Sequence, residues 1–177
     1  MPGIVETRSG KPEDALCLGV LATQVFLDTY ATNGIRPDLA REALSAYSRE
    51  TFTERLADPN ICFILAEVNG HLVAFAEVAF ASACPVPGFA QVELARLYVQ
   101  RHFQRLGIGQ TLVRGAERLA REHGFESVWL TAWSGNIPAL AFYPAIGYRD
   151  IGATTYVIEG QGHENRIFAK EIPHSGV

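Results

Sequence analysis

The chain has 177 residues, of which 48% are hydrophobic, and carries a formal net charge of −4. This length suits one domain, and the apolar content is sufficient for a hydrophobic core. The small negative charge gives no basic surface of the kind that binds nucleic acid, so we expect no nucleic-acid partner.

The cysteines and the N-terminal segment indicate the cellular compartment in which the protein is expected. Cys17, Cys62 and Cys84 are far apart in the sequence and lack metal-ligand spacing. We therefore expect reduced thiols, no disulfide framework and no metal. The first eight residues lack the apolar stretch of a signal peptide, and no apolar run is long enough to span a membrane. These features predict a cytoplasmic protein without a membrane partner.

The first third of the chain predicts a short strand at residues 4–8 and two helical regions. Lys11-Pro12-Glu13-Asp14 suits the start of a helix that ends near Tyr30, because proline and acids favour the first turn. Asn33-Gly34 separates this helix from a second helical region at residues 39–56. The expected buried residues of the first helix are Leu16, Val20, Leu21, Val25 and Phe26.

The remaining elements alternate between strands and helices. Residues 61–68 and 71–80 predict a hairpin across Asn69-Gly70, the strongest short hairpin signal in the chain. A loop at residues 81–91 precedes a strand at 92–99, and a helix follows at about 107–123. Another strand is expected at 127–132, then a helix after Asn136. Residues 148–158 and 165–172 form a closing pair across Glu159-Gly160-Gln161-Gly162.

The helix that begins at Gly107 and Gly109 predicts an anion site. The first N–H groups of a helix have no partner within it, and its dipole favours negative charge. The two glycines leave room for a pyrophosphate, and Gln104 and Arg105 add donors nearby. A simple turn with a glycine helix start explains the same residues. The Walker and dinucleotide motifs do not fit, because no Gly-Lys-Ser/Thr triplet is present and Leu112 replaces the third glycine.

Two segments resemble motifs of the GNAT N-acetyltransferases. Gln104-Arg105-Leu106-Gly107-Ile108-Gly109 is similar to the family's acetyl-CoA loop, Gln/Arg-x-x-Gly-x-Gly/Ala. Asn136-Ile137-Pro138-Ala139-Leu140-Ala141-Phe142-Tyr143, followed by Gly147-Tyr148, is similar to its Asn-x-x-Ala-x-x-Phe-Tyr segment. The resemblance implies an α/β (α+β) fold: one N-acetyltransferase domain over residues 1–177, with a mixed, mostly antiparallel sheet and helices on both faces. A splayed parallel strand pair, beginning near Val92 and Ser127, would hold acetyl-CoA.

The resemblance also implies which residues contact acetyl-CoA, the expected cosubstrate. They come from the strand end, the glycine loop and the second motif: Leu97, Tyr98, Val99, Gln104, Arg105, Leu106, Gly107, Ile108, Gly109, Gln110, Asn136, Ala139 and Tyr143. Asn136 suits either a hydrogen bond to the pantetheine arm or a helix cap.

Two residues are expected to carry the chemistry. Tyr143 matches the family's acid: a phenol, with a pKa of about 10, stays protonated and can donate to the departing thiolate. Its alternative role is to close the core, and Pro144 is expected to kink or end the helix at Tyr143. Glu93 lies in an apolar strand and suits either a base that acts through water or an ion pair with Arg96.

The expected substrate-binding residues are Tyr30, Glu93 and His163, the last in the loop near the closing pair. Trp133 and Tyr30 suit pocket walls or core equally well. Phe26-Leu27-Asp28-Thr29-Tyr30 and Gly162-His163-Glu164-Asn165-Arg166-Ile167 loosely resemble the spermine/spermidine N-acetyltransferase-like branch.

The expected reaction is transfer of an acetyl group from acetyl-CoA to a primary amine of a small molecule, with polyamine-like acceptors among the candidates. Direct transfer in a ternary complex is implied, because the matched motifs contain no cysteine that could carry the acetyl group. The alternatives are acetylation of peptide or protein N-termini, and a non-catalytic sensor that binds acyl-CoA. A homodimer is left open.

Overall fold

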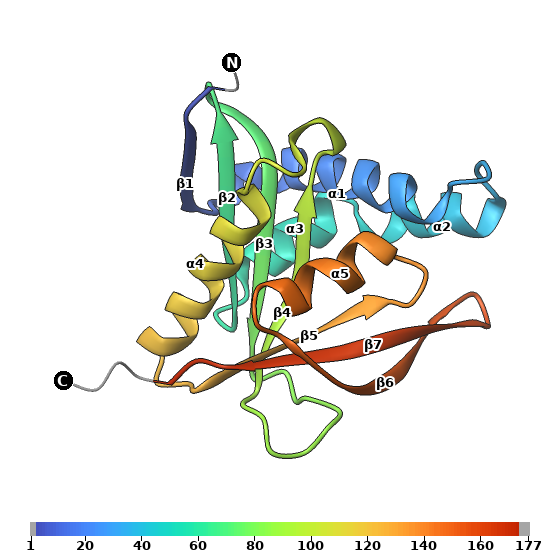
Figure 1. Ribbon diagram of the computed structural model, residues 1–177. Helices are drawn as coiled ribbons and strands as arrows, with labels where there is room; N and C mark the ends of the chain where they lie inside the picture. Colours follow the sequence, from blue (N-terminus) through green and yellow to red (C-terminus); the bar gives the residue numbers. More distant parts are fainter. Residues whose placement is uncertain (1–2, 174–177) are drawn as a thin grey trace.

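Seven strands form one sheet in the order β1-β2-β3-β4-β5-β7-β6 in the computed structural model, which describes residues 3–173 (Figure 1). Neighbouring strands are antiparallel except β4 and β5, which are parallel. The strands are β1 (Val5–Ser9), β2 (Ile61–Val68), β3 (His71–Phe80), β4 (Val92–Val99), β5 (Ser127–Trp133), β6 (Arg149–Ile158) and β7 (Gln161–Glu171). The helices are α1 (Ala15–Tyr30), α2 (Pro37–Ala46), α3 (Arg49–Ala57), α4 (Ile108–Glu122) and α5 (Ile137–Ala145), with short 3₁₀ turns η1 (Pro12–Asp14) and η2 (Arg101–Phe103).

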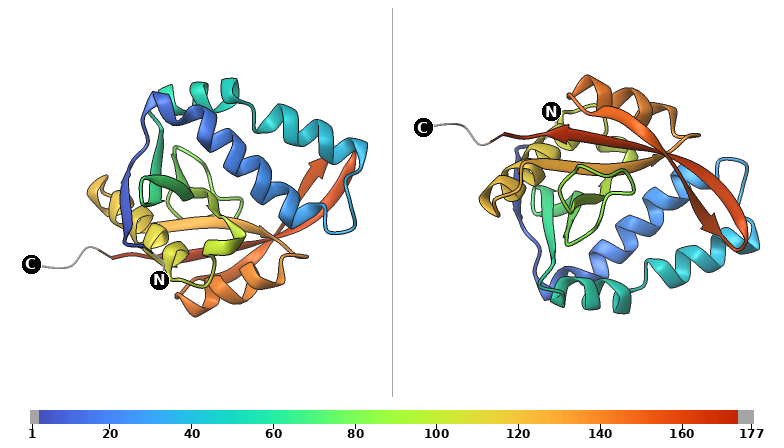
Figure 2. Two further views of the ribbon diagram at one scale, coloured as in Figure 1. Left: turned by 90° about the horizontal axis from the view of Figure 1, so that it is seen from above. Right: turned by 90° about the horizontal axis from the view of Figure 1, so that it is seen from below.

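The helices cover both faces of the sheet, with α1, α2 and α3 on one side and α4 and α5 on the other (Figure 2). Each face has its own hydrophobic cluster. Leu112 and Val113 of α4 pack with Leu130 on one side, and Phe26 and Phe52 pack with other core residues on the opposite side. The expected mixed, mostly antiparallel sheet with helices on both faces is confirmed.

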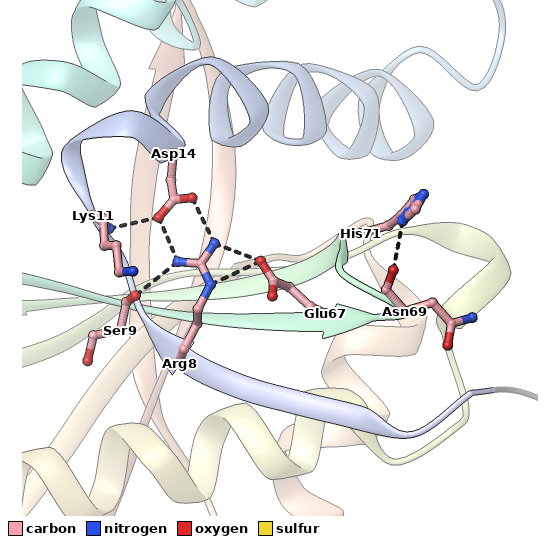
Figure 3. Close-up of polar contacts among 7 residues, drawn as sticks. All are labelled: Arg8, Ser9, Lys11, Asp14, Glu67, Asn69 and His71. Carbon is pink, nitrogen blue, oxygen red and sulfur yellow. Dashed lines mark hydrogen bonds and ion pairs between the residues drawn. The ribbon is translucent and has the colours of Figure 1, made fainter.

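The first strands are joined by local features that the sequence predicts. Asn69 and Gly70 have φ of 52° and 75°, as a two-residue hairpin turn requires, and asparagine and glycine tolerate this conformation best. Arg8 holds β1 to its surroundings, because its guanidinium donates to Asp14 at 2.8 Å and to Glu67 at 2.6 Å (Figure 3).

The helical prediction needs two corrections. Residues 39–56 form two helices rather than one, because Ser48 has an extended backbone and its Oγ accepts a hydrogen bond from the N–H of Thr51 at 3.1 Å, capping α3. In α1, Leu21 and Phe26 are buried as predicted, but Leu16 and Val20 are 56% and 65% exposed. The helix is apolar around most of its circumference, so periodicity alone does not determine its buried face.

The closing hairpin is tighter than predicted. Glu159 and Gly160, with φ of 45° and 81°, form a two-residue turn, and β7 begins directly at Gln161. His163 therefore lies in a strand and not in a loop. The hairpin end reaches α2, where Nε of Arg41 donates to Oε1 of Glu159 at 2.6 Å (Figure 2). Within residues 3–173, no helix is both long and apolar enough to cross a membrane.

Candidate active site

The site is organised around the place where β4 and β5 separate. The ladder between these parallel strands consists of one pair, Glu93 and Trp129, in the described chain. A bulge follows at once on the other edge of β4: Leu94 pairs with Val78 and Arg96 with Glu77, which leaves Ala95 as the extra residue. Beyond Ala95, the edge of β4 that faces β5 is free to pair with a ligand.

The start of α4 provides a second set of free backbone donors. Gly107 has a φ of 81°, a left-handed conformation that glycine adopts without strain. The N–H of Thr111 bonds to the carbonyl of Gly107 at 3.0 Å, so the N–H groups of residues 108–110 have no partner within the helix. A Cβ on Gly109 would lie 3.5 Å from the Phe142 ring, which shows how close α5 lies to this first turn. The arrangement suits a bound anion.

The predicted cofactor-binding residues fall into three groups. The exposed ones are Gln104, Arg105, Leu106 and Gly107; the half-buried ones are Leu97, Tyr98, Val99, Gly109, Gln110, Asn136 and Ala139; the buried ones are Ile108 and Tyr143. The side chain of Ile108 belongs to the core, so only its backbone can reach a ligand. Tyr98 points to the opposite sheet face from Leu97 and packs against Phe75, with ring centroids 5.4 Å apart.

Tyr143 is held firmly in the last turn of α5. It is 8% exposed and packs against the rings of Tyr148 and Phe168. Burial raises the pKa of its phenol, so the hydroxyl is neutral at physiological pH. This hydroxyl makes no hydrogen bond to any described residue.

Pro144 does not end the helix at Tyr143, so the expected stop at this residue was wrong. The helix continues to Ala145, and the carbonyl of Tyr143 accepts hydrogen bonds from the N–H groups of Ile146 and Tyr148 at 3.2 and 3.0 Å. Proline is tolerated because it lies in the final turn, where its missing N–H removes one helical bond. Asn136 caps the other end, since its Oδ1 accepts from the N–H of Ala139 at 3.3 Å.

Glu93 does not form the ion pair with Arg96 that the sequence left open. Its Oε2 accepts a hydrogen bond from Oγ of Ser82 at 2.6 Å, and the carbonyl of Ser82 accepts from Nε1 of Trp129 at 3.0 Å. Arg96 instead bonds Glu77 at 2.6 Å, because the Ala95 bulge places these two residues opposite each other. Glu93 is therefore a half-buried carboxylate held by a hydroxyl.

The structure brings two predicted substrate-binding residues together with Trp133. Tyr30 lies at the end of α1, Trp133 at the end of β5 and His163 in β7. The ring centroid of Tyr30 is 5.0 Å from that of Trp133 and 6.5 Å from that of His163. Burial also raises the pKa of Tyr30. These three rings, which we call the aromatic group, lie on the sheet face covered by α1.

Sequence reasoning missed two residues around the site, Ser82 and Glu77. Ser82 lies in a loop and carries no recognisable signal. Glu77 is fully buried between Arg55 and Arg96, and only the strand register shows this contact. The single available clue was the pair of charges, Glu93 and Arg96, in an otherwise apolar strand.

Comparison with known proteins shows the family to which this chain belongs. Residues 31–148 match the family model described as "Acetyltransferase (GNAT) family", and the chain therefore belongs to this family of N-acetyltransferases. An uncharacterized N-acetyltransferase from the pepI 3′ region of Lactobacillus delbrueckii subsp. lactis is 23% identical over 153 residues, covering 86% of this chain and 88% of that protein.

Two further similarities are to named N-acetyltransferases. The N-alpha-acetyltransferase of Sulfurisphaera tokodaii is 26% identical over 106 residues, which span 56% of this chain and 64% of that protein. The crystal structure of the PaiA N-acetyltransferase of Thermoplasma acidophilum, in complex with coenzyme A, superimposes with a TM-score of 0.77 at 22% identity, covering 95% of this chain and 99% of that one. At this identity, the similarity to the T. acidophilum structure shows a shared fold.

Proposed function

We propose that this N-acetyltransferase transfers an acetyl group from acetyl-CoA to the primary amine of a small molecule, directly and in a ternary complex. The observation that carries the proposal is the start of α4 together with the separation of β4 from β5 after Glu93 and Trp129. The coenzyme A bound to the T. acidophilum protein supports the choice of donor.

The backbone supplies most of the cofactor contacts in this proposal. The N–H groups of residues 108–110 bind the pyrophosphate, with Gln104 and Arg105 at its exposed side. The free edge of β4 beyond Ala95 forms hydrogen bonds with the amides of the pantetheine arm. Asn136 can cap α5 through its oxygen and donate to the arm through its nitrogen. Acetyl-CoA supplies the thioester that the amine attacks.

Tyr143 serves as the donor to the departing sulfur. Its phenol stays protonated because burial raises its pKa. The hydroxyl makes no hydrogen bond to any described residue and can therefore donate to the sulfur. A thiol has an ordinary pKa of about 8.5, below that of the phenol, so Tyr143 mainly stabilises the thiolate by a hydrogen bond. Such a contact strengthens as charge develops on sulfur, and so it favours the transition state.

Glu93 serves as the base, acting through water. Successive residues of a strand point to opposite faces, and Val92 and Leu94 pack in the same cluster as Tyr143. Glu93 therefore approaches the strand gap from the face opposite Tyr143. This separation suits a reaction in which the amine loses its proton on one side and sulfur leaves on the other.

The similarity to the S. tokodaii N-alpha-acetyltransferase favours a second candidate, acetylation of peptide N-termini. A third, an acyl-CoA sensor, would require neither Tyr143 nor Glu93. The spermine/spermidine-like resemblance remains a prediction about the acceptor.

A thiol-release assay with acetyl-CoA tests the proposal across polyamines, aminoglycosides, amino acids and short peptides. We expect acceptor-dependent thiol release with at least one small amine, and mass spectrometry should show one added acetyl group. Release with peptides alone would favour the second candidate. Tight acetyl-CoA binding without release by any acceptor would favour the sensor.

A further inference from the structure

Two ion-pair networks in this protein have opposite charge balance. In the first, Arg8 lies between two carboxylates, Asp14 and Glu67 (Figure 3). In the second, the carboxylate of Glu77 lies between two guanidinium groups, those of Arg55 and Arg96. Among the ion pairs within residues 3–173, the Glu77 network is the one in which cations outnumber carboxylates.

The excess charge of the Glu77 network lies largely inside the protein. Glu77 is fully buried, and its two oxygens are both used: Oε1 accepts from Arg55 and Oε2 from Nη1 of Arg96 at 2.6 Å. The side chain of Arg96 is only 20% exposed, with its guanidinium 5.8 Å from the Tyr47 ring centroid. A half-buried positive charge without its own anion is unfavourable, and a bound anion would relieve it.

Arg96 is the member of this network that lies nearest the proposed reaction centre. The sheet order is β3-β4-β5, so Arg96 on β4 stands between Glu77 on β3 and the place where β4 leaves β5. It follows the Ala95 bulge directly and lies on the face covered by α1 and α3. Its Nε and Nη2 atoms make no hydrogen bond to any residue that the structure describes. Two such parallel N–H groups match the two oxygens of a carboxylate.

We propose that Arg96 binds a carboxylate of the acceptor, so that the acceptor is an amino acid or a similar small molecule with a carboxylate close to its primary amine. The inference rests on the proposed function and narrows its substrate class. The aromatic group of Tyr30, Trp133 and His163, on the same sheet face, suits the remainder of such a molecule. Polyamines lack the carboxylate, and peptides carry theirs far from the reacting amine.

The test compares each of a panel of amino acids with its amide, which keeps the α-amine but has no charged carboxylate. We expect kcat/KM for the best amino acid to exceed that of its amide by about 10- to 100-fold, the range for a charge-assisted hydrogen-bonded pair. Arg96→Gln should reduce this ratio to near one, whatever its effect on the absolute rates, and should leave the affinity for acetyl-CoA nearly unchanged.

Arg55→Gln is the matched control. It removes the other guanidinium from the same buried carboxylate, so it should lower the melting temperature comparably but retain the preference for the amino acid. If Arg96→Gln does not fold because Glu77 loses its partner, the double variant Glu77→Gln/Arg96→Gln removes both charges of this pair and is measured in its place. Glu77→Gln alone keeps Arg96 and should keep the preference.

The outcomes separate this inference from the function on which it rests. Equal turnover of amino acids and their amides by the parent, or an undiminished ratio in the folded Arg96 variants, overturns carboxylate recognition and leaves the acetyltransferase proposal standing. A lack of acetylation of every amine, with intact acetyl-CoA binding, overturns the proposed function and this inference with it.

Discussion

The two faces of the sheet build their halves of the site by different means. On the α4 and α5 side, the proposed cofactor contacts come mostly from two short continuous segments and from backbone N–H groups. On the α1 side, the proposed acceptor contacts come from the side chains of four separate elements, those of Tyr30, Arg96, Trp133 and His163. Substitutions on the first side should therefore change acetyl-CoA binding, and those on the second should change acceptor binding. Tyr143 on the first side and Glu93 on the second are proposed to act on the reacting groups, so their substitution should affect the rate.

The largest effect is expected from Tyr143→Phe. The ring and its packing against Tyr148 and Phe168 are kept, so stability should change little. Loss of one hydrogen bond to a charge that develops in the transition state typically lowers the rate by roughly 10²–10³-fold. Single-turnover kinetics should show this decrease with unchanged acetyl-CoA affinity. Equal single-turnover rates in the parent and the variant would contradict the role of Tyr143 as donor to the departing sulfur and leave water as the donor.

Gly109→Glu should weaken acetyl-CoA binding by about 100-fold or more, because it places bulk and negative charge where charge-assisted hydrogen bonds to the pyrophosphate are proposed. Gly109→Ala is the control, since its Cβ would make an ordinary contact of 3.5 Å with Phe142. Calorimetry measures both affinities. A folded Glu variant that binds as tightly as the parent would remove the pyrophosphate from this loop.

Glu93→Gln should lower the rate by at least about 10-fold if the carboxylate is the base, with the greatest loss at low pH, where the amine is most protonated. Ser82→Ala keeps the carboxylate and removes the 2.6 Å hydrogen bond, so its effect on the rate should be smaller. Turnover per folded molecule and melting temperature are measured on one preparation. Preserved turnover with a lower melting temperature would assign Glu93 a structural role.

Trp133→Ala should raise the KM for the acceptor by about 10-fold, which corresponds to about 1.4 kcal/mol for the lost aromatic contact. Trp133→Phe keeps a ring beside Tyr30 and should have a smaller effect. Acetyl-CoA affinity should remain the same in both variants, because this residue lies on the sheet face proposed to bind the acceptor. A change in cofactor affinity that equals the change in KM would contradict the division between the two faces.

The smallest effect is expected at the Arg8 network, far from either half of the site. Hydrogen bonds from Arg8 lower the pKa of Asp14 below its ordinary value. The ion pair of Asp14 with Arg8 therefore contributes fully to stability above the unfolded-state pKa of Asp14, about 4. This contribution is lost as the pH falls through the lower pKa that Asp14 has in the folded protein. Arg8→Gln should lower stability at neutral pH by about 1 kcal/mol or less, since Arg8 is partly exposed. Thermal melts should converge at low pH, and an equal difference at every pH would contradict the linkage.

Features that depend on a few neighbouring residues could be predicted from the sequence. The Asn69-Gly70 turn, the strands beside it and the glycine-opened start of α4 are of this kind, because backbone conformation there follows from local chemistry. The motif segments also indicated the family. Even the break at Ser48 had a local cause, a serine cap, although the surrounding helical pattern concealed it.

Features that depend on register and packing were decided only by the tertiary structure. The Ala95 bulge determines that Arg96 meets Glu77, while the loop before β4 brings Ser82 to Glu93. The packing of α1 determines that Leu16 and Val20 remain exposed, and the hairpin register brings His163 to Tyr30. Each of these features depends on how separate elements are placed against one another, and a shift of one residue in the register of a strand changes every partner.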